Sequence, residues 1–369
     1  MRLLETYFVC VLSFDCSNDP SSNPTTSRPV KALPPLRPGM PVAKRQSLFR
    51  QKLELCSVRY NFSDPSTQRE REIKRQTLLE LIKFTNTPSG QKVFCDTSMP
   101  QVLKMLEANI FRDMPSESQD LAEEEDETPV QSSWPHLQAV YEFMLRFVVS
   151  SEVKPKIARK HLHRNFCKNL IALFNSEDPR ERDYLKTILH RIYGKFMTYR
   201  SLIRRHIQYV FYEFLFETGK HNGIGELLEI LGAIINGFQL PLKKEHLHFL
   251  AHTLIPLHKT NSLQFYHLQL FYCMTQYIEK DRNTAIPIIL GILKYWPWSN
   301  TSKQLLLFNE LEDIMELISP AVLERVVRCT VSCFLKYNSM RSLLFAMVLL
   351  VCLFVLHRVF RCLSTLESV

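Results

Sequence analysis

The sequence predicts an all-α protein, an α-solenoid of HEAT- or armadillo-like helical-hairpin repeats. Apolar residues recur at the spacing of amphipathic helices through most of the 369 residues, and helix starts repeat at a nearly constant interval. Only nine glycines are present, too few for a turn-rich β-barrel or for a nucleotide-binding α/β protein. Because a helical pair cannot cover its own apolar faces, we expect neighbouring pairs to stack.

Residues 1–46 are expected to form a disordered leader, because a segment so rich in proline and serine cannot bury a core. The apolar run at 7–14 is short and follows Glu5, which makes it a poor secretory signal. The solenoid itself is expected from 47 to 327. Its first helices are predicted in SLFRQKLELCSV (47–58), REREIKRQTLLELIKFT (69–85) and MPQVLKMLEANIF (99–111).

Residues 114–130 are expected to form a long exposed loop, since seven of the eleven residues 117–127 are acidic and prolines stand at both ends. After this loop, helices begin at 136, 183, 225, 267 and 309, at spacings of 47, 42, 42 and 42 residues. A second helix is predicted within each interval. Two helices per about 40–47 residues is the period of HEAT and armadillo repeats.

The predicted helix that starts near 179 carries unusually complete start signals. Asp178 is suited to cap it, Pro179 occupies the first helical position, and Glu181 is expected to close a capping box. An apolar stripe then recurs at helical spacing and predicts a buried face. Its members are Leu185, Ile188, Leu189, Ile192 and Phe196.

A second stripe on the same helix is polar and aromatic, and it lies next to the apolar face. It consists of Lys186, His190 and Tyr193. The following repeat supplies two isoleucines on one helix face and two basic residues at the start of the next helix. These are Ile230, Ile234, Lys243 and His246. Stacked repeats would set the isoleucines beside the cations, in a groove suited to an extended peptide with apolar anchors and a carboxylate or phosphate.

The positive charge of the chain is concentrated in one stretch. Residues 154–205 hold fourteen Lys or Arg against four Asp or Glu, a net charge of +10, while the whole chain has a formal charge of +9. This distribution indicates a local basic surface with an acidic partner. Nucleic acid is the rival ligand, but a site that follows a nucleic-acid backbone would spread its charge along the array. Nucleic-acid binding and a general scaffold role therefore remain the alternatives.

The sequence contains none of the glycine-rich phosphate-binding motifs, no G-x-S-x-G and no Gly-Asp pair of the metallophosphatases. The histidine pairs His161/His163 and His246/His248 are spaced by two, which points their side chains apart on a helix. We therefore expect no enzymatic activity, no cofactor and no metal. The ten cysteines form no C-x-x-C, and we expect reduced thiols in a cytoplasmic protein that also enters the nucleus.

Several long strings resemble the B′ regulatory subunit family of protein phosphatase type 2A. They include LFRQKLELC, MLEANIFRDMP, WPHLQAVYEFMLRF, SEDPRERD, LHRIYGKF, HNGIGELLEILGAIINGF, PLKKEH and LKYWP, and the resemblance covers about 47–320. It implies a non-catalytic HEAT-like solenoid that joins a scaffold subunit and a catalytic phosphatase subunit in signal transduction. It also implies that a concave groove holds Leu-x-x-Ile-x-Glu motifs of client proteins.

Carried over residue by residue, the resemblance assigns a peptide-binding site to eight positions. They are His190, Arg191, Tyr193, Arg200, Ile230, Ile234, Lys243 and His246. Arg191 and Arg200 enter on the resemblance alone, whereas the other six also follow from the spacing argument.

The end of the chain departs from the family pattern. After Pro320 the family continues with further repeats, which the divergent hydrophobic tail 328–369 replaces here. Because those repeats help meet the catalytic subunit in the family, we expect weakened association with it. Residues 342–356 are uncharged, but a helix of fifteen residues is only about 22 Å long against a hydrocarbon core of about 30 Å. We expect a helix over the last repeat, with a membrane anchor through 342–356 as the alternative.

Overall fold

A computed structural model describes residues 32–37, 39–62, 64–112 and 129–337. The chain divides into two compact units, Met1–Pro34 and Pro35–Val369, and all elements below lie in the second. Every regular element within the described ranges is helical, so the all-α prediction is confirmed. Most of the predicted leader, the acidic segment 113–128 and the tail segment 342–356 lie outside the described residues. Within the described ranges, no helix combines the length and the apolar character needed to cross a bilayer.

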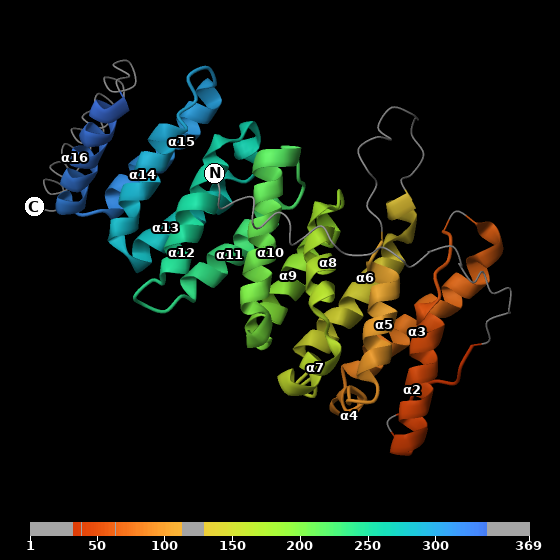
Figure 1. Cartoon of the computed structure of the whole chain (residues 1–369). Helices are drawn as coiled ribbons and strands as arrows, with labels where there is room; N and C mark the ends of the chain where they lie inside the picture. Colours follow the sequence, from red (N-terminus) through yellow and green to blue (C-terminus); the bar gives the residue numbers. More distant parts are fainter. Residues whose placement is uncertain (1–31, 38, 63, 113–128, 338–369) are drawn as a thin grey trace, which may run out of the picture. The chain divides into compact units, whose positions relative to one another are not determined.

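The helices form two layers, and each helix of the first layer contacts its neighbours in that layer (Figure 1). The first layer consists of α3 (Gln68–Thr85), α6 (Pro129–Val149), α9 (Pro179–Lys195), α11 (Ile224–Asn236), α13 (His267–Lys280) and α15 (Thr301–Leu317). The second consists of α2 (Val42–Ser57), α5 (Met99–Ile110), α8 (Arg164–Ala172), α10 (Arg200–Glu213), α12 (Lys244–Phe249), α14 (Ala285–Lys294) and α16 (Pro320–Tyr337). The predicted helical-pair repeat is thus confirmed.

Several boundaries differ from the sequence prediction. The first helix begins at Val42 rather than at 47, and ahead of it Leu36 is buried, with its backbone N–H donating to Glu80 Oε1 at 2.6 Å. The short helices α4 (Pro88–Gln91) and α7 (Pro155–His161) were not expected. Short 3₁₀ turns are also present, at Pro65–Thr67, Leu173–Asn175, Met197–Tyr199, Asn261–Phe265 and Arg282–Thr284.

Two second-layer helices change their winding before they end. α10 continues as a π-helical turn, Phe214–Thr218, and stops at Gly219, whose φ of 66° is accessible at little cost to glycine. α12 is followed by a π-helical turn, Leu250–Leu254, and a 3₁₀ segment, Ile255–Lys259. The single helix predicted there is therefore divided, and Pro256, which has no N–H for an i→i−4 bond, lies at the change.

The apolar stripe of α9 forms the buried face that its spacing predicts. Leu185, Ile188 and Leu189 have no exposed surface, and Ile192 and Phe196 expose 1% and 3%. Burying each side chain contributes about 1.5–3 kcal/mol relative to leaving it exposed. This face packs α9 between α6 and α11, so it joins three consecutive repeats.

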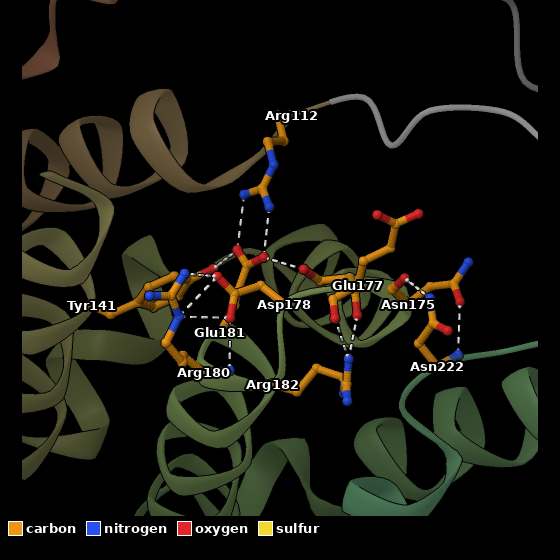
Figure 2. Close-up of polar contacts among 10 residues, drawn as sticks. Arg112, Tyr141, Asn175, Glu177, Asp178, Arg180, Glu181, Arg182 and Asn222 are labelled. Atoms are coloured by element: carbon orange, nitrogen blue, oxygen red, sulfur yellow. Dashed lines mark hydrogen bonds and ion pairs between the residues drawn. The ribbon is translucent and has the colours of Figure 1, made fainter. Parts of the chain in front are cut away.

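The start of α9 differs from the prediction at Glu181. Asp178 accepts a hydrogen bond from the backbone N–H of Arg180 at 2.8 Å, as a cap does. Glu181 instead turns inward and is fully buried (Figure 2). The donors to its carboxylate are Arg112 Nη1 and Nη2 at 2.8 and 2.6 Å, the Tyr141 hydroxyl at 2.6 Å, and the Ser176 hydroxyl. The capping-box prediction is wrong, because a buried carboxylate requires a cation, and Arg112, which follows α5, supplies it.

Other polar contacts between repeats recur at the repeat spacing. Lys195 Nζ donates to the carbonyl oxygens of Val148 and Ser150, at 2.7 and 2.5 Å and separations of 47 and 45 residues. Lys303 Nζ donates in the same way to Lys259 and Thr260, at 3.0 and 2.8 Å. Both lysines thereby bind carbonyl groups at the end of a preceding helix, which lack partners within that helix.

A fully buried carboxylate also lies between two histidines at the junction with α15. Glu310 Oε1 is 3.1 Å from His258 Nε2, and Glu310 Oε2 is 2.9 Å from His267 Nε2. His258 Nδ1 is 2.8 Å from the carbonyl oxygen of Ile255. Because a carbonyl and a carboxylate only accept hydrogen bonds, both ring nitrogens of His258 must donate, so His258 is cationic.

Burial alone would lower the pKa of His258 and raise that of Glu310, yet their mutual attraction outweighs burial at both groups. The pKa of His258 is raised above 6.5, through the charge and hydrogen bond of Glu310 and the bond to Ile255. The pKa of Glu310 falls from 4.5 to about 2, through His258 and His267. The stabilisation that Glu310 contributes is present above pH 4.5 and is lost as pH falls towards 2. The stabilisation that His258 contributes is present below pH 6.5 and is lost as pH rises through the raised pKa of His258.

We therefore expect the substitution Glu310→Gln to destabilise the protein most between pH 4.5 and 6.5, where both groups are charged in the native protein. Urea unfolding midpoints of the variant and the unmodified chain, measured from pH 3 to pH 9, test this expectation. Glu312→Gln, at an exposed position on the same helix, is the control. A difference between variant and unmodified chain that does not depend on pH would contradict the assignment.

Replacing Glu181 by alanine should be strongly destabilising, because Arg112 and Tyr141 would keep buried polar groups without their acceptor. Removing one partner of such a buried pair costs about 3–5 kcal/mol. Urea unfolding followed by circular dichroism measures this loss, with Asp183→Ala, an exposed acidic residue of α9, as the control. Equal unfolding midpoints for the two variants would show that the buried pair contributes nothing.

Candidate functional site

The eight predicted site residues lie on four successive elements, α9 to α12. α9 carries His190, Arg191 and Tyr193, and α10 begins at Arg200. α11 carries Ile230 and Ile234, Lys243 precedes α12, and His246 lies within it. The residues therefore come from two neighbouring repeats, as the spacing predicts.

Tyr193 is held by two arginines of α10. Arg200 Nε donates to the carbonyl oxygen of Tyr193 at 3.0 Å, and its guanidinium carbon lies 5.3 Å from the centre of the Tyr193 ring. Arg204 Nη1 donates to the Tyr193 hydroxyl at 3.0 Å. The turn Met197–Tyr199 brings the start of α10 back against the end of α9, which places these groups together. Cations thus contact both the ring and the hydroxyl of Tyr193.

The same cluster reaches the next repeat through Arg204. Arg204 Nη2 lies 3.4 Å from Glu245 Oε1, and this oxygen is also 3.4 Å from His246 Nε2. The chain of contacts from Tyr193 through Arg204 and Glu245 to His246 therefore joins α9, α10 and α12. We call these four residues the bridging cluster.

Phe238 of its own repeat and Tyr277 of the next repeat hold His246 in place. Its ring stacks on Phe238, with centroids 3.7 Å apart and an interplanar angle of 3°, and only 8% of the residue is exposed. The Tyr277 hydroxyl donates to the His246 carbonyl oxygen at 3.0 Å. His246 Nε2 lies 3.4 Å from Glu245 Oε1, whereas His246 Nδ1 is buried and has no hydrogen-bond partner in the described part of the chain.

The predicted positive charge at His246 is not supported. Burial lowers the pKa of His246 below 6.5, and the charges of Arg204 and Lys243 lower it further, against the opposing effect of Glu245. The ring is therefore neutral at pH 7 and offers hydrogen bonds rather than a cation.

The other predicted residues differ in exposure. His190, Arg191 and Lys243 are exposed. Ile230 and Ile234 expose only 2% and 5% of their surface, because α11 is covered by α9 on one side and α13 on the other. The structure thus brings Tyr193, Arg200 and His246 into one cluster, but it leaves both isoleucines covered.

Lys186, the first member of the polar stripe, stabilises the junction between repeats instead of facing the cluster. Its Nζ lies 2.8 Å from Glu229 of α11 and 3.0 Å from Asp183 of its own helix. Arg182, one turn earlier, makes a similar pair with Glu226 at 2.7 Å. These two ion pairs set the position of α11 against α9.

Sequence reasoning missed Arg204 and Glu245, the residues that complete the bridging cluster. Arg204 follows Arg200 by one helical turn and so lies on the same face of α10, a signal that was present in the sequence. Glu245 gave no such signal, because its role depends on the position of α12 against α10. Within the described residues, no three His, Cys, Asp or Glu side chains are placed to hold a metal ion.

A sequence model of the protein phosphatase 2A regulatory B subunit (B56 family) matches residues 33–346. This chain belongs to the B56 family. The match includes every helix that carries the bridging cluster, and it extends beyond both ends of the 47–320 stretch that the quoted strings cover. The predicted resemblance is therefore confirmed.

Known relatives of this B56 chain occur in plants and animals. The B′ eta isoform of the 59 kDa regulatory subunit of Arabidopsis thaliana protein phosphatase 2A is 50% identical over 304 residues, which cover 80% of this chain and 59% of that protein. The 57 kDa B′ theta isoform of the same plant is 50% identical over 304 residues, covering 80% of this chain and 61% of that protein. The 56 kDa delta isoform of Homo sapiens is 46% identical over 311 residues, covering 83% and 51%. The chain thus spans about half to three-fifths of the relatives' length.

The electrostatics of the bridging cluster can be tested at His246. Substituting Glu245 by glutamine removes the charge that raises the pKa of His246, so the pKa should fall further below 6.5. Titration of the histidine side chains by NMR, with Glu177→Gln as a control distant from the cluster, measures this change. An unchanged or raised pKa in the Glu245→Gln variant would show that Glu245 and His246 do not interact in solution.

Proposed function

We propose that this B56 chain is a non-catalytic targeting subunit of a protein phosphatase 2A complex, in which it joins a scaffold subunit and a catalytic subunit. The family match and the relatives, which are named as regulatory subunits of this phosphatase, support the proposal. The chain would contribute recognition while the catalytic subunit supplies the chemistry, in the cytoplasm and nucleus.

We further propose that client proteins bind the surface of α9 to α12 through a Leu-x-x-Ile-x-Glu motif. The observation that carries this proposal is the bridging cluster, because it holds side chains of two neighbouring repeats on one connected surface. Next to it, His190, Arg191 and Lys243 are exposed and carry the basic groups that a motif carboxylate needs. Extended peptides that offer alternating apolar and acidic side chains are suited to such a surface.

Each predicted residue would then have a defined role in the site. Arg191 and Lys243 would pair with the acidic residue of the motif, and His190 would donate a hydrogen bond. Tyr193, oriented by Arg200, would pack against the backbone and the apolar anchors. Ile230 and Ile234 would form the floor of the anchor sites, and His246 would contribute a neutral ring. Because the two isoleucines are covered, binding would require side chains around α11 to move.

The charge reversal Arg191→Glu should abolish capture of a Leu-x-x-Ile-x-Glu peptide and leave helicity unchanged, because the residue is exposed. Loss of the charge-assisted contacts and the new repulsion should cost about 2–5 kcal/mol, which is at least about 30-fold in affinity. The measurement is peptide binding by fluorescence anisotropy with the full chain. In parallel, pull-downs of purified scaffold and catalytic subunits test assembly.

The matched control for this experiment is Arg75→Glu, a charge reversal at an exposed arginine of α3. We expect the Arg191→Glu variant to lose the peptide but to retain the two subunits, and the Arg75→Glu variant to retain both. Unaltered peptide affinity in Arg191→Glu would refute the assigned site. Failure of the unmodified chain to capture either subunit would refute the role in a phosphatase complex.

A further inference from the structure

A basic pocket of about 390 Å³ lies where α7, the start of α8 and the start of α10 meet. Its lining shares no residue with the eight predicted positions or with the bridging cluster. We call it the arginine pocket and define it by the six residues with polar or charged side chains that the argument uses. They are Arg159, His163, Arg164, Thr198, Ser201 and Arg205.

The three arginines of the pocket form no ion pair with any described acidic side chain, unlike several other cations of the same basic stretch. Within the described ranges, no Asp or Glu side chain lies within ion-pairing distance of Arg159, Arg164 or Arg205, and all three are exposed. Other cations of the same basic stretch are paired, among them Lys160 with Asp96, Arg182 with Glu226 and Arg204 with Glu245. The pocket therefore concentrates positive charge that the described part of the fold does not neutralise.

The positive charge changes the pKa values of two nearby side chains. Burial raises the pKa of Tyr199, and the charges of Arg159 and Arg164 lower it. Burial lowers the pKa of His206, and the charges of Lys168 and Arg205 lower it further. Several cations thus act on the same small region, and an anion placed among them would relieve their repulsion.

We propose that the arginine pocket binds the phosphate group of a phosphorylated serine or threonine in a protein segment. A guanidinium fork matches two phosphate oxygens, and several arginines can share the charge of about −1.5 to −2 that a phosphomonoester carries at pH 7. The hydroxyls of Thr198 and Ser201 supply further donors. A pocket of about 390 Å³ has room for one phosphorylated side chain. The pocket shares no residue with the proposed client groove.

Single-stranded nucleic acid is the less favoured ligand, although it also carries phosphates. Proteins that hold single strands combine a basic track with exposed aromatic rings on which the bases stack. Tyr199, the tyrosine that lines the pocket, exposes 6% of its surface and donates its hydroxyl hydrogen to the Leu162 carbonyl oxygen at 2.6 Å. Its ring is therefore too deeply covered to stack on a base, whereas the exposed guanidinium groups remain open to a phosphate.

The test uses the full chain and a fluorescein-labelled peptide with one phosphoserine among glycine and alanine residues. Fluorescence anisotropy should detect binding of this peptide and not of its unphosphorylated form. Arg164→Ala and Arg205→Ala should each weaken binding about tenfold or more, because each removes charge-assisted hydrogen bonds. Arg164→Lys, which keeps the charge but not the fork, should restore part of the affinity.

The controls separate this site from the rest of the molecule. Two variants should leave phosphopeptide affinity within about twofold: Arg75→Ala, which removes an exposed guanidinium from α3, and Arg191→Glu in the client groove. Circular dichroism should show unchanged helicity in every variant. The proposal is overturned if Arg164→Ala and Arg205→Ala bind the phosphopeptide normally, or if inorganic phosphate binds as tightly as the peptide. Tighter binding of a twelve-residue oligouridine, with affinity lost in the same arginine variants, would equally overturn it in favour of RNA.

Discussion

Neutralisation of buried polar groups across the junctions between repeats is the interaction on which this structure depends. Apolar helix faces attract one another without fixing their relative position, whereas a buried charge is tolerated only when a specific partner meets it. Glu181 binds Arg112, which lies 69 residues earlier in the chain, and Glu310 lies between His258 and His267. These contacts set the position of each helical pair against the next. They therefore also fix the relative positions of residues on a surface that two repeats share.

Much of the fold could be predicted from the sequence, because helical repeats are encoded locally. The alternation of paired helices and the apolar stripe of α9 depend only on residues within one repeat, and both predictions are confirmed. The predicted spacings of 47, 42, 42 and 42 residues are not, because the helices α6, α9, α11, α13 and α15 begin at intervals of 50, 45, 43 and 34 residues. The burial of Glu181 and its pairing with Arg112 could not be predicted. Arg112 lies 69 residues earlier in the chain, and the local sequence pattern matched a capping box equally well. The divided helix after Phe249 was missed for a related reason, because the apolar period continues through the change in winding.

The candidate site could be predicted in part, and the limit is physical. Helix periodicity and repeat spacing predicted that Tyr193 and His246 would lie on adjoining faces, and contacts through Arg204 and Glu245 connect them, whereas Arg200 was assigned from the resemblance alone. The sequence could not give the exposure of Ile230 and Ile234, which depends on how closely α9 and α13 cover α11. Nor could it give the neutral state of His246, which follows from stacking on Phe238 and from the charges of Arg204 and Lys243.

The layered contacts have a consequence for how the molecule loses its structure. Each helix of the first layer mainly touches the helices before and after it, so no central core is shared by all repeats in the described part of the chain. Opening one junction then destabilises mainly the two repeats that form it, and the effect on stability decreases with distance along the array. Heat or denaturant should therefore melt the protein in segments instead of in a single cooperative step, with the weakest junction deciding where melting starts.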